Sequence, residues 1–274
     1  MRLDLPSLSE TVKRHRLRAD KGLGQHFLLD SNITDKIASF CDLPAPVLEV
    51  GPGPGGLTRS LIEAGAEPVI AIEMDARFLP ALDEVAKASG KLDVVAGDAL
   101  EVRPNLPDNH VIAANLPYNV GTKLLTNWLT QSPRQWSQMV LMFQLEVAER
   151  VVARPGESAY GRLAVLAQSV AECHIAMKIP ASAFSPPPKV DSAVVVLRPL
   201  ASPYPHLRDL SRVTQAAFGQ RRKMLRAALK GLAKSSELSA EEWLVSSGIE
   251  PTARAETVPV RSFQNLTDRL RNQS

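Results

Sequence analysis

The stretch Glu49-Val50-Gly51-Pro52-Gly53-Pro54-Gly55-Gly56 stands between a short apolar run and a helix-forming segment. Glycines placed between a strand and a helix let the backbone approach a ligand at the carboxyl edge of a parallel sheet. Gly51, Gly53 and Gly56 also satisfy the spacing G-x-G-x-x-G, and Glu73 follows 22 residues after Gly51. This pattern predicts a nucleotide site in which an acidic side chain meets ribose hydroxyls.

Strand-like and helix-like segments alternate on both sides of this loop. Short apolar runs predict strands at 46–50, 69–72, 92–96, 110–114 and 139–143. Helical spacing of apolar residues predicts helices at 33–40, 57–64, 76–88, 120–129 and 145–153. Such alternation is typical of a parallel sheet covered by helices on both faces, so the sequence predicts an α/β fold.

The pattern changes after residue 155. One helix and two strands are predicted there, at 163–170, 174–179 and 193–197. Three prolines within 199–205 indicate a linker, after which the chain turns helical with basic and apolar residues mixed. The sequence therefore predicts three parts, namely an N-terminal arm at 1–30, a catalytic domain at 31–200 and a small all-helical domain at 201–274.

Three acidic side chains lie at the ends of three consecutive predicted strands. Glu49 can hold a methionine ammonium group, Glu73 can bind ribose hydroxyls, and Asp98 can accept a hydrogen bond from an adenine amino group. This set suits an adenosine joined to an amino acid without a pyrophosphate, and so predicts S-adenosyl-L-methionine. An NAD-dependent oxidoreductase is the alternative on the glycine pattern alone, and a helix N-cap is the alternative role for Asp98.

Asn115-Leu116-Pro117-Tyr118 follows the fourth predicted strand and is the most informative stretch for chemistry. An exocyclic adenine amino group is a poor nucleophile because its lone pair is delocalised into the ring. The Asn115 side-chain oxygen and a backbone carbonyl at Leu116 or Pro117 can accept its two N–H groups and direct the lone pair at a sulfonium methyl. Tyr118 can stack on a base taken out of its helix. An ordinary turn with a packed aromatic is the alternative.

Composition excludes several other classes of protein. The 274 residues carry 32 basic and 29 acidic side chains, and 45% are hydrophobic, which is ordinary globular usage. Cys41 and Cys173 form no metal or disulfide pattern and follow no proline, so we expect core cysteines and no cytosine-C5 chemistry. The five histidines are scattered, so no metal is predicted. No secretory leader or membrane span is visible, and a cytoplasmic location is expected.

With these residues in place, the chain strongly resembles the ribosomal RNA adenine dimethyltransferase family, and within it the KsgA/RsmA enzymes. Nine segments match in order. They are 21–28, 49–53, Glu73, 97–98, 115–119, 144–148, 158–163, 184–194 and 220–226. Many relatives have Asn at the position of His26, and leucine and alanine at those of Pro54 and Gly56.

The resemblance implies a Rossmann-like class I methyltransferase with a seven-stranded mixed sheet, its last strand antiparallel, and a small all-helical C-terminal domain. It implies N6,N6-dimethylation of two adjacent adenosines near the 3′ end of 16S rRNA in the small ribosomal subunit, with a role in subunit maturation, by a monomer. Phe184 would stack on the base opposite Tyr118. The residues expected around the cofactor are His26, Leu28, Glu49, Gly51, Gly53, Glu73, Asp98 and Asn115.

The charge distribution predicts where RNA binds. Residues 31–198 carry 14 basic and 18 acidic side chains, whereas 199–274 carry 12 basic and 7 acidic. On a continuous helix, Arg222, Arg226 and Lys230 would share one face, with Met224 and Leu225 turned to the core. We therefore predict a phosphate-contacting surface, to which the N-terminal basic run 13–18 can add. The predicted phosphate-contacting residues are Arg221, Arg222, Lys223 and Arg226.

Two further functional alternatives remain open from the sequence. One is a 23S rRNA adenine-N6 dimethyltransferase of the macrolide-resistance type, against which the segments 158–163 and 220–226 argue. The other is a non-catalytic ribosome-assembly factor, against which the intact stretch 115–118 argues.

Overall fold

The computed structural model describes residues 2–20, 24–131, 134–220, 222–233 and 239–272. The chain divides into two compact units. The first unit contains 1–127, 131–148 and 174–198, and the second contains 128–130, 149–173 and 199–274. This division follows contacts rather than chain order, so the segment 149–173 belongs with the C-terminal helices.

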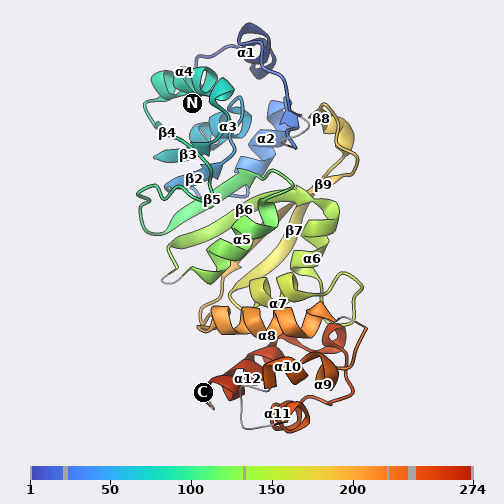
Figure 1. Cartoon of the computed structure of the whole chain (residues 1–274). Helices are drawn as coiled ribbons and strands as arrows, with labels where there is room; N and C mark the ends of the chain where they lie inside the picture. The colour runs from blue at the N-terminus through green and yellow to red at the C-terminus, as the bar shows by residue number, and fades with distance from the viewer. Residues whose placement is uncertain (1, 21–23, 132–133, 221, 234–238, 273–274) are drawn as a thin grey trace. The chain divides into compact units, whose positions relative to one another are not determined.

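The fold is built on a seven-stranded sheet, and the glycine loop follows one of its strands (Figure 1). Its order is β4 (Leu92–Ala96), β3 (Val69–Glu73), β2 (Val47–Val50), β5 (His110–Asn115), β6 (Trp136–Gln144), β9 (Ser192–Pro199) and β7 (Ala171–Ile179). The pairs from β4 to β6 are parallel, and β9 runs antiparallel to β6. The predicted α/β class and the mixed seven-stranded sheet are therefore confirmed.

The strands form where the sequence has unbroken apolar runs. Every residue of β2 and β3 is buried, which is the pattern of a parallel sheet with both faces covered. The covering helices begin at clear signals, as at α2, where the Asp30 side chain accepts from the Asn32 N–H at 2.9 Å. The α-helices up to residue 152 are α1 (Leu8–Arg14), α2 (Ser31–Ala38), α3 (Gly56–Glu63), α4 (Leu79–Ser89), α5 (Gly121–Thr130) and α6 (Leu145–Val152), and the last residues of α5 and α6 belong to the second unit.

A second, two-stranded sheet joins distant parts of the sequence. Strand β1 (Phe27–Leu28) pairs antiparallel with β8 (Phe184–Ser185), with Phe27 opposite Ser185 and Leu28 opposite Phe184. The sequence does not predict this sheet, because two-residue strands have no periodicity. Its consequence is that the N-terminal motif lies beside the proline-rich segment that precedes β9.

The second unit is helical, as predicted for the end of the chain. Its core contains the fully buried Trp243, whose indole N–H donates to the Leu266 carbonyl at 2.8 Å, and Tyr160, whose hydroxyl donates to the Val258 carbonyl at 2.9 Å. Its helices are α7 (Arg162–Gln168), α8 (Leu207–Gly219), α9 (Leu225–Ala228), α10 (Lys230–Ala233), α11 (Ala240–Ser246) and α12 (Val260–Arg271).

The basic segment after α8 is not one continuous helix, so the predicted shared helical face is wrong. Helix α8 ends at Gly219, and the Lys223 N–H donates to the Gln220 carbonyl in a turn before α9 begins. Glycine is a weak helix former, which favours the break there. Met224, expected in the core, is 43% exposed, whereas Leu225 is buried as predicted.

Candidate active site

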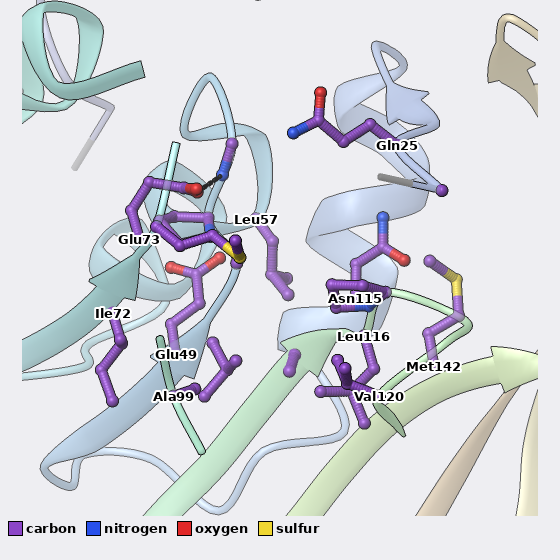
Figure 2. Close-up of a pocket in the computed structure, with 18 of the residues that line it drawn as sticks. Gln25, Glu49, Leu57, Ile72, Glu73, Ala99, Asn115, Leu116, Val120 and Met142 are labelled. Atoms are coloured by element: carbon purple, nitrogen blue, oxygen red, sulfur yellow. Dashed lines mark hydrogen bonds between the residues drawn. The ribbon is translucent and has the colours of Figure 1, made fainter. Parts of the chain in front are cut away.

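A cavity of about 310 Å³ opens at the carboxyl ends of β2, β3, β4 and β5 in the first unit. Figure 2 shows the carboxylates of Glu49 and Glu73 on one side of this cavity and the carboxamide of Asn115 on the other. Every residue predicted around the cofactor lines it, namely His26, Leu28, Glu49, Gly51, Gly53, Glu73, Asp98 and Asn115. Leu116, Pro117 and Tyr118 line it as well.

The glycine loop has the backbone conformation for which glycine is suited. Gly51 and Gly53 have φ angles of 70° and 55°, in the left-handed region that side chains disfavour. This turn brings the Gly53 N–H to 3.0 Å from a Glu73 carboxylate oxygen. The loop after β2 is thereby fixed to the end of β3.

Glu49 is a carboxyl group without the partners that a buried charge needs. Its side chain is 1% exposed, and its Oε2 atom has no hydrogen-bond partner among the described residues. Burial raises the pKa of Glu49 to about 8, and the nearby Glu73 carboxylate adds to the rise. An orphaned acidic oxygen in a cavity wall fits a cationic ligand group such as an ammonium.

Glu73 and Asp98 have partners but keep acceptor capacity. Glu73 accepts from the Gly53 N–H at 3.0 Å and from the Asp75 N–H at 2.8 Å, and burial raises its pKa. Asp98 Oδ1 accepts from the Leu100 N–H at 2.8 Å. A turn follows Asp98 rather than a helix, so the alternative of a helix N-cap is wrong. A carboxylate oxygen has more than one lone pair, and both side chains can still accept from a ligand.

Asn115 ends β5 with its carboxamide free of hydrogen bonds to any described residue, and it projects toward the cavity (Figure 2). The Pro117 carbonyl accepts from Val120 and Gly121 at the start of α5, at 3.2 and 3.0 Å. No described donor reaches the Leu116 carbonyl. Of the two backbone carbonyls that the sequence left open, that of Leu116 is therefore the one without a described donor.

Tyr118 is held through both its hydroxyl and its ring. The hydroxyl lies 2.8 Å from the Ser192 Oγ atom, and the ring centroid lies 5.7 Å from that of His26 at an interplanar angle of 30°. Burial raises the pKa of Tyr118, so the phenol stays neutral at physiological pH. A fixed, neutral aromatic ring in the cavity wall is suited to stacking on a base.

Phe184 and the described residues of the basic cluster are not among the residues that line this cavity. Phe184 is 4% exposed, belongs to the apolar core and does not line the cavity, so its stacking role stays a prediction. Arg222 and Lys223 are exposed in the second unit, and Arg226 pairs with Glu241 at 3.0 Å. Arg221 and the motif residues 21–23 lie outside the described residues.

Gln25 lines the cavity, although sequence analysis gave it no role of its own. Its side-chain N–H donates to Asp75 at 3.0 Å, and Arg77 holds the pKa of that aspartate well below its usual range. The Asp75 N–H in turn donates to Glu73. Only the motif containing Gln25 could have suggested it, because the partner lies 50 residues away.

The remaining chemical candidates do not form a site. Burial raises the pKa of Cys41 and of Cys173 to about 12, so neither is a reactive thiolate, and neither lines the cavity. Within the described ranges no group of three or more His, Cys, Asp and Glu side chains is arranged to hold a metal ion. In the same ranges, no helix combines the length and apolar character needed to cross a membrane.

The comparisons with known proteins agree with this geometry. The family described as ribosomal RNA adenine dimethylase matches residues 16–272. The chain is 56% identical to a ribosomal RNA small subunit methyltransferase A from Ruegeria pomeroyi, over 97% of both chains, and 52% identical to one from Maricaulis maris, over 97% of this chain and 96% of that one.

Two solved structures are similar over most of the chain. A dimethyladenosine transferase from Plasmodium falciparum has a TM-score of 0.74 at 28% identity, covering 88% of this chain and 96% of its own. The 23S rRNA methyltransferase ErmE has a TM-score of 0.68 at 28% identity, covering 89% and 99%. The fold, the cavity and these matches lead to one conclusion: the chain belongs to the ribosomal RNA adenine dimethylase family.

Proposed function

We propose that this protein transfers methyl groups from S-adenosyl-L-methionine to N6 of two adjacent adenosines near the 3′ end of 16S rRNA. Each adenosine becomes N6,N6-dimethyladenosine, within a maturing small ribosomal subunit in the cytoplasm, and the enzyme acts as a monomer. The observation that carries the proposal is the free Asn115 carboxamide beside the unused Leu116 carbonyl in the cavity that Glu49 and Glu73 line. The names of the small-subunit relatives support the choice of substrate.

Each acidic residue of the cavity is assigned the part of the cofactor that can donate a hydrogen bond to it. Glu49 would accept from the methionine ammonium, Glu73 from the ribose hydroxyls and Asp98 from the adenine amino group. The other members of the set, His26, Leu28, Gly51 and Gly53, shape the cavity around these contacts. When bound, the cofactor supplies an electrophilic methyl group on a sulfonium.

The residues around the target base supply the activation of N6. The Asn115 side-chain oxygen and the Leu116 carbonyl accept its two N–H groups, which withdraws the lone pair from the ring and aims it at the methyl group. Pro117 stiffens the turn that presents them, and Tyr118 stacks on the base, with Phe184 predicted on its other face. The proton can leave N6 after transfer, so the mechanism requires no general base.

RNA binding is assigned to the exposed basic cluster of the second unit. Arg222 and Lys223 have no carboxylate partner among the described residues, whereas Arg226 is paired with Glu241. Their charges suit the phosphate backbone, which dominates the affinity of proteins for nucleic acids. Arg221 belongs to the same cluster by sequence.

The first prediction tests Asn115. Asn115→Ala removes one of two acceptors for N6, and we expect methyl transfer to small subunits lacking the modification to fall by about 100-fold or more. Transfer is measured with radiolabelled cofactor, and calorimetry with S-adenosylhomocysteine should show that cofactor binding persists. Dimethylation at the wild-type rate by this variant would remove Asn115 from the mechanism.

The likeness to ErmE keeps a 23S rRNA substrate as the second candidate. Mapping dimethyladenosine on both rRNAs, with and without the protein, separates the two. An assembly role alone would stand if Asn115→Ala restores subunit maturation in a deletion strain while its rRNA stays unmethylated.

A further inference from the structure

The His26 side chain makes its polar contact with the protein's proline-rich segment and not with the acids of the cofactor cavity. Its Nδ1 atom lies 2.8 Å from the Pro186 carbonyl oxygen. The β1–β8 pairing explains this contact, because Phe27 is opposite Ser185 and His26 and Pro186 are the next residues outward in an antiparallel register. His26 also lines the cavity, so it connects the proline-rich segment to the site.

The contact with Pro186 determines which nitrogen of the His26 imidazole carries a hydrogen. A carbonyl oxygen can only accept a hydrogen bond, so Nδ1 must donate and carry a proton. In the neutral ring, Nε2 is therefore an acceptor, and it has no partner among the described residues. His26 consequently combines a fixed ring orientation with one unused acceptor.

The ring of His26 lies beside Tyr118, whose position is fixed from the other end by Ser192. The two ring centroids are 5.7 Å apart with planes inclined by 30°, a geometry of aromatic contact. Ser192 is fully buried at the start of β9 and holds the Tyr118 hydroxyl at 2.8 Å. His26 thus restrains the rotation of the Tyr118 ring that the Ser192 hydrogen bond leaves free.

We infer that His26 is a positioning residue for the target adenine, which it orders by holding the Tyr118 ring from the Pro186 carbonyl. This inference rests on the proposed function, since it assigns the base-stacking role to Tyr118. A ring that is oriented before RNA binds loses less conformational freedom when the base stacks on it. The His26 side chain therefore acts on the transfer step, while its neighbours along the chain serve the cofactor.

The test compares His26→Ala, His26→Asn and His26→Phe, with exposed His174→Asn as the matched control. Asparagine keeps an N–H donor for Pro186 but no ring, and phenylalanine keeps the ring but no donor. We expect His26→Ala to lower the single-turnover transfer rate by about 10- to 100-fold, because small misplacements of reacting groups are costly. His26→Asn and His26→Phe should each transfer methyl groups faster than His26→Ala but more slowly than wild type. The control His174→Asn should match wild type.

Two further measurements show whether His26 acts through Tyr118. The dissociation constant of S-adenosylhomocysteine should change by no more than about twofold in His26→Ala, because the polar contact of this side chain is with Pro186 and not with the acids assigned to the cofactor. In a double-mutant cycle, His26→Ala should cost much less when Tyr118 is already alanine. Thermal unfolding checks that each variant is folded.

The possible failures are distinguishable. If wild type transfers no methyl group to adenine in small-subunit rRNA, the proposed function itself fails. If wild type is active but His26→Ala loses cofactor affinity as much as rate, His26 is a cofactor ligand and the inference is overturned. It is also overturned if the effects of His26→Ala and Tyr118→Ala multiply independently.

Discussion

Glu49 is a buried carboxyl group in the wall of the cavity, with one side-chain oxygen that has no described partner. A carboxyl group that is 1% exposed and has an oxygen without a partner is costly to ionise, so in the free protein it holds its proton near neutral pH. A buried carboxyl group of this kind is suited to receive a positive group in the cavity, as proposed for the methionine ammonium.

The second prediction concerns the stability of the free protein. The folded-state pKa of Glu49 is raised to about 8, whereas the unfolded group titrates near 4.5. Between these pH values the folded state binds more protons than the unfolded state. The contribution of Glu49 to the free energy of unfolding therefore falls as pH rises and is lowest above pH 8. The free energy of unfolding of Glu49→Gln minus that of wild type should therefore increase from pH 5 to pH 8. The increase should be a few kcal/mol, at about 1.4 kcal/mol per pKa unit.

Urea unfolding at several pH values measures this difference. The exposed Glu250→Gln is the control and should give no pH-dependent gain. A constant difference between Glu49→Gln and wild type over the whole range would show that Glu49 is already ionised in the folded state.

The third prediction concerns cofactor binding. A bound ammonium favours the Glu49 carboxylate, so binding below pH 8 should release a proton and affinity should rise with pH up to about 8. Calorimetry with S-adenosylhomocysteine in buffers of different ionisation enthalpy measures the released proton. Glu49→Gln should abolish the part due to this residue, and a release unchanged in that variant would contradict the assignment.

At the scale of elements, the N-terminal arm is built against the glycine loop. Helix α1 starts with a capping box between Ser7 and Glu10, and its end is closed by hydrogen bonds from the Arg16 and Leu17 N–H groups to Lys13 and Val12 carbonyls. The helix is fixed to α3, where Arg59 donates to the Pro6 carbonyl at 2.7 Å. The arm is therefore held against the helix that follows the glycine loop.

Gly56 is the position at which this packing is tightest, and it carries the fourth prediction. A Cβ atom there would lie 2.8 Å from a Leu8 methyl and 3.2 Å from the Leu28 carbonyl oxygen. The Leu8 side chain can move, but the backbone oxygen must shift with β1, so we expect Gly56→Ala to destabilise the protein by about 1 kcal/mol.

Chemical denaturation of Gly56→Ala compared with Gly219→Ala tests this packing. Gly219 is an exposed helical glycine with no atom within 4 Å of an added Cβ, so its substitution should be neutral or mildly stabilising. Equal stability of the two variants would show that α1 does not rest on the glycine loop.

At the scale of the whole molecule, the net charge of +3 is the sum of regions of opposite sign. Residues 31–198 have four more acidic than basic side chains, and residues 199–274 have five more basic than acidic ones. The first range includes the acids that line the cavity, which suit a cationic ligand, and the second includes a basic cluster suited to phosphate. One chain can therefore bind ligands of opposite charge without a large net charge.

The fifth prediction uses the salt dependence of RNA binding. Replacing Arg222 and Lys223 together by alanine should weaken binding to small-subunit rRNA and reduce the slope of log affinity against log salt by about 1 to 2. Arg226→Ala should have a smaller effect because Glu241 already neutralises it. Filter binding over a range of salt concentrations measures both, and the exposed Arg269→Ala is the control. An unchanged slope would place the RNA surface elsewhere.

The sequence by itself determined those features that local chemistry controls. Unbroken apolar runs predicted the central strands, because parallel strands are buried on both faces. The polar residues after these strands predicted the cavity, because the carboxyl ends of parallel strands meet at one edge of the sheet. Tertiary structure decided features that depend on contacts between distant residues. These are the β1–β8 pairing, the hydrogen bonds of His26 to Pro186 and of Tyr118 to Ser192, and the bonds that occupy the Pro117 carbonyl but leave that of Leu116 without a described donor. No periodicity records such contacts, because each is made by one or two residues whose partners lie elsewhere in the fold.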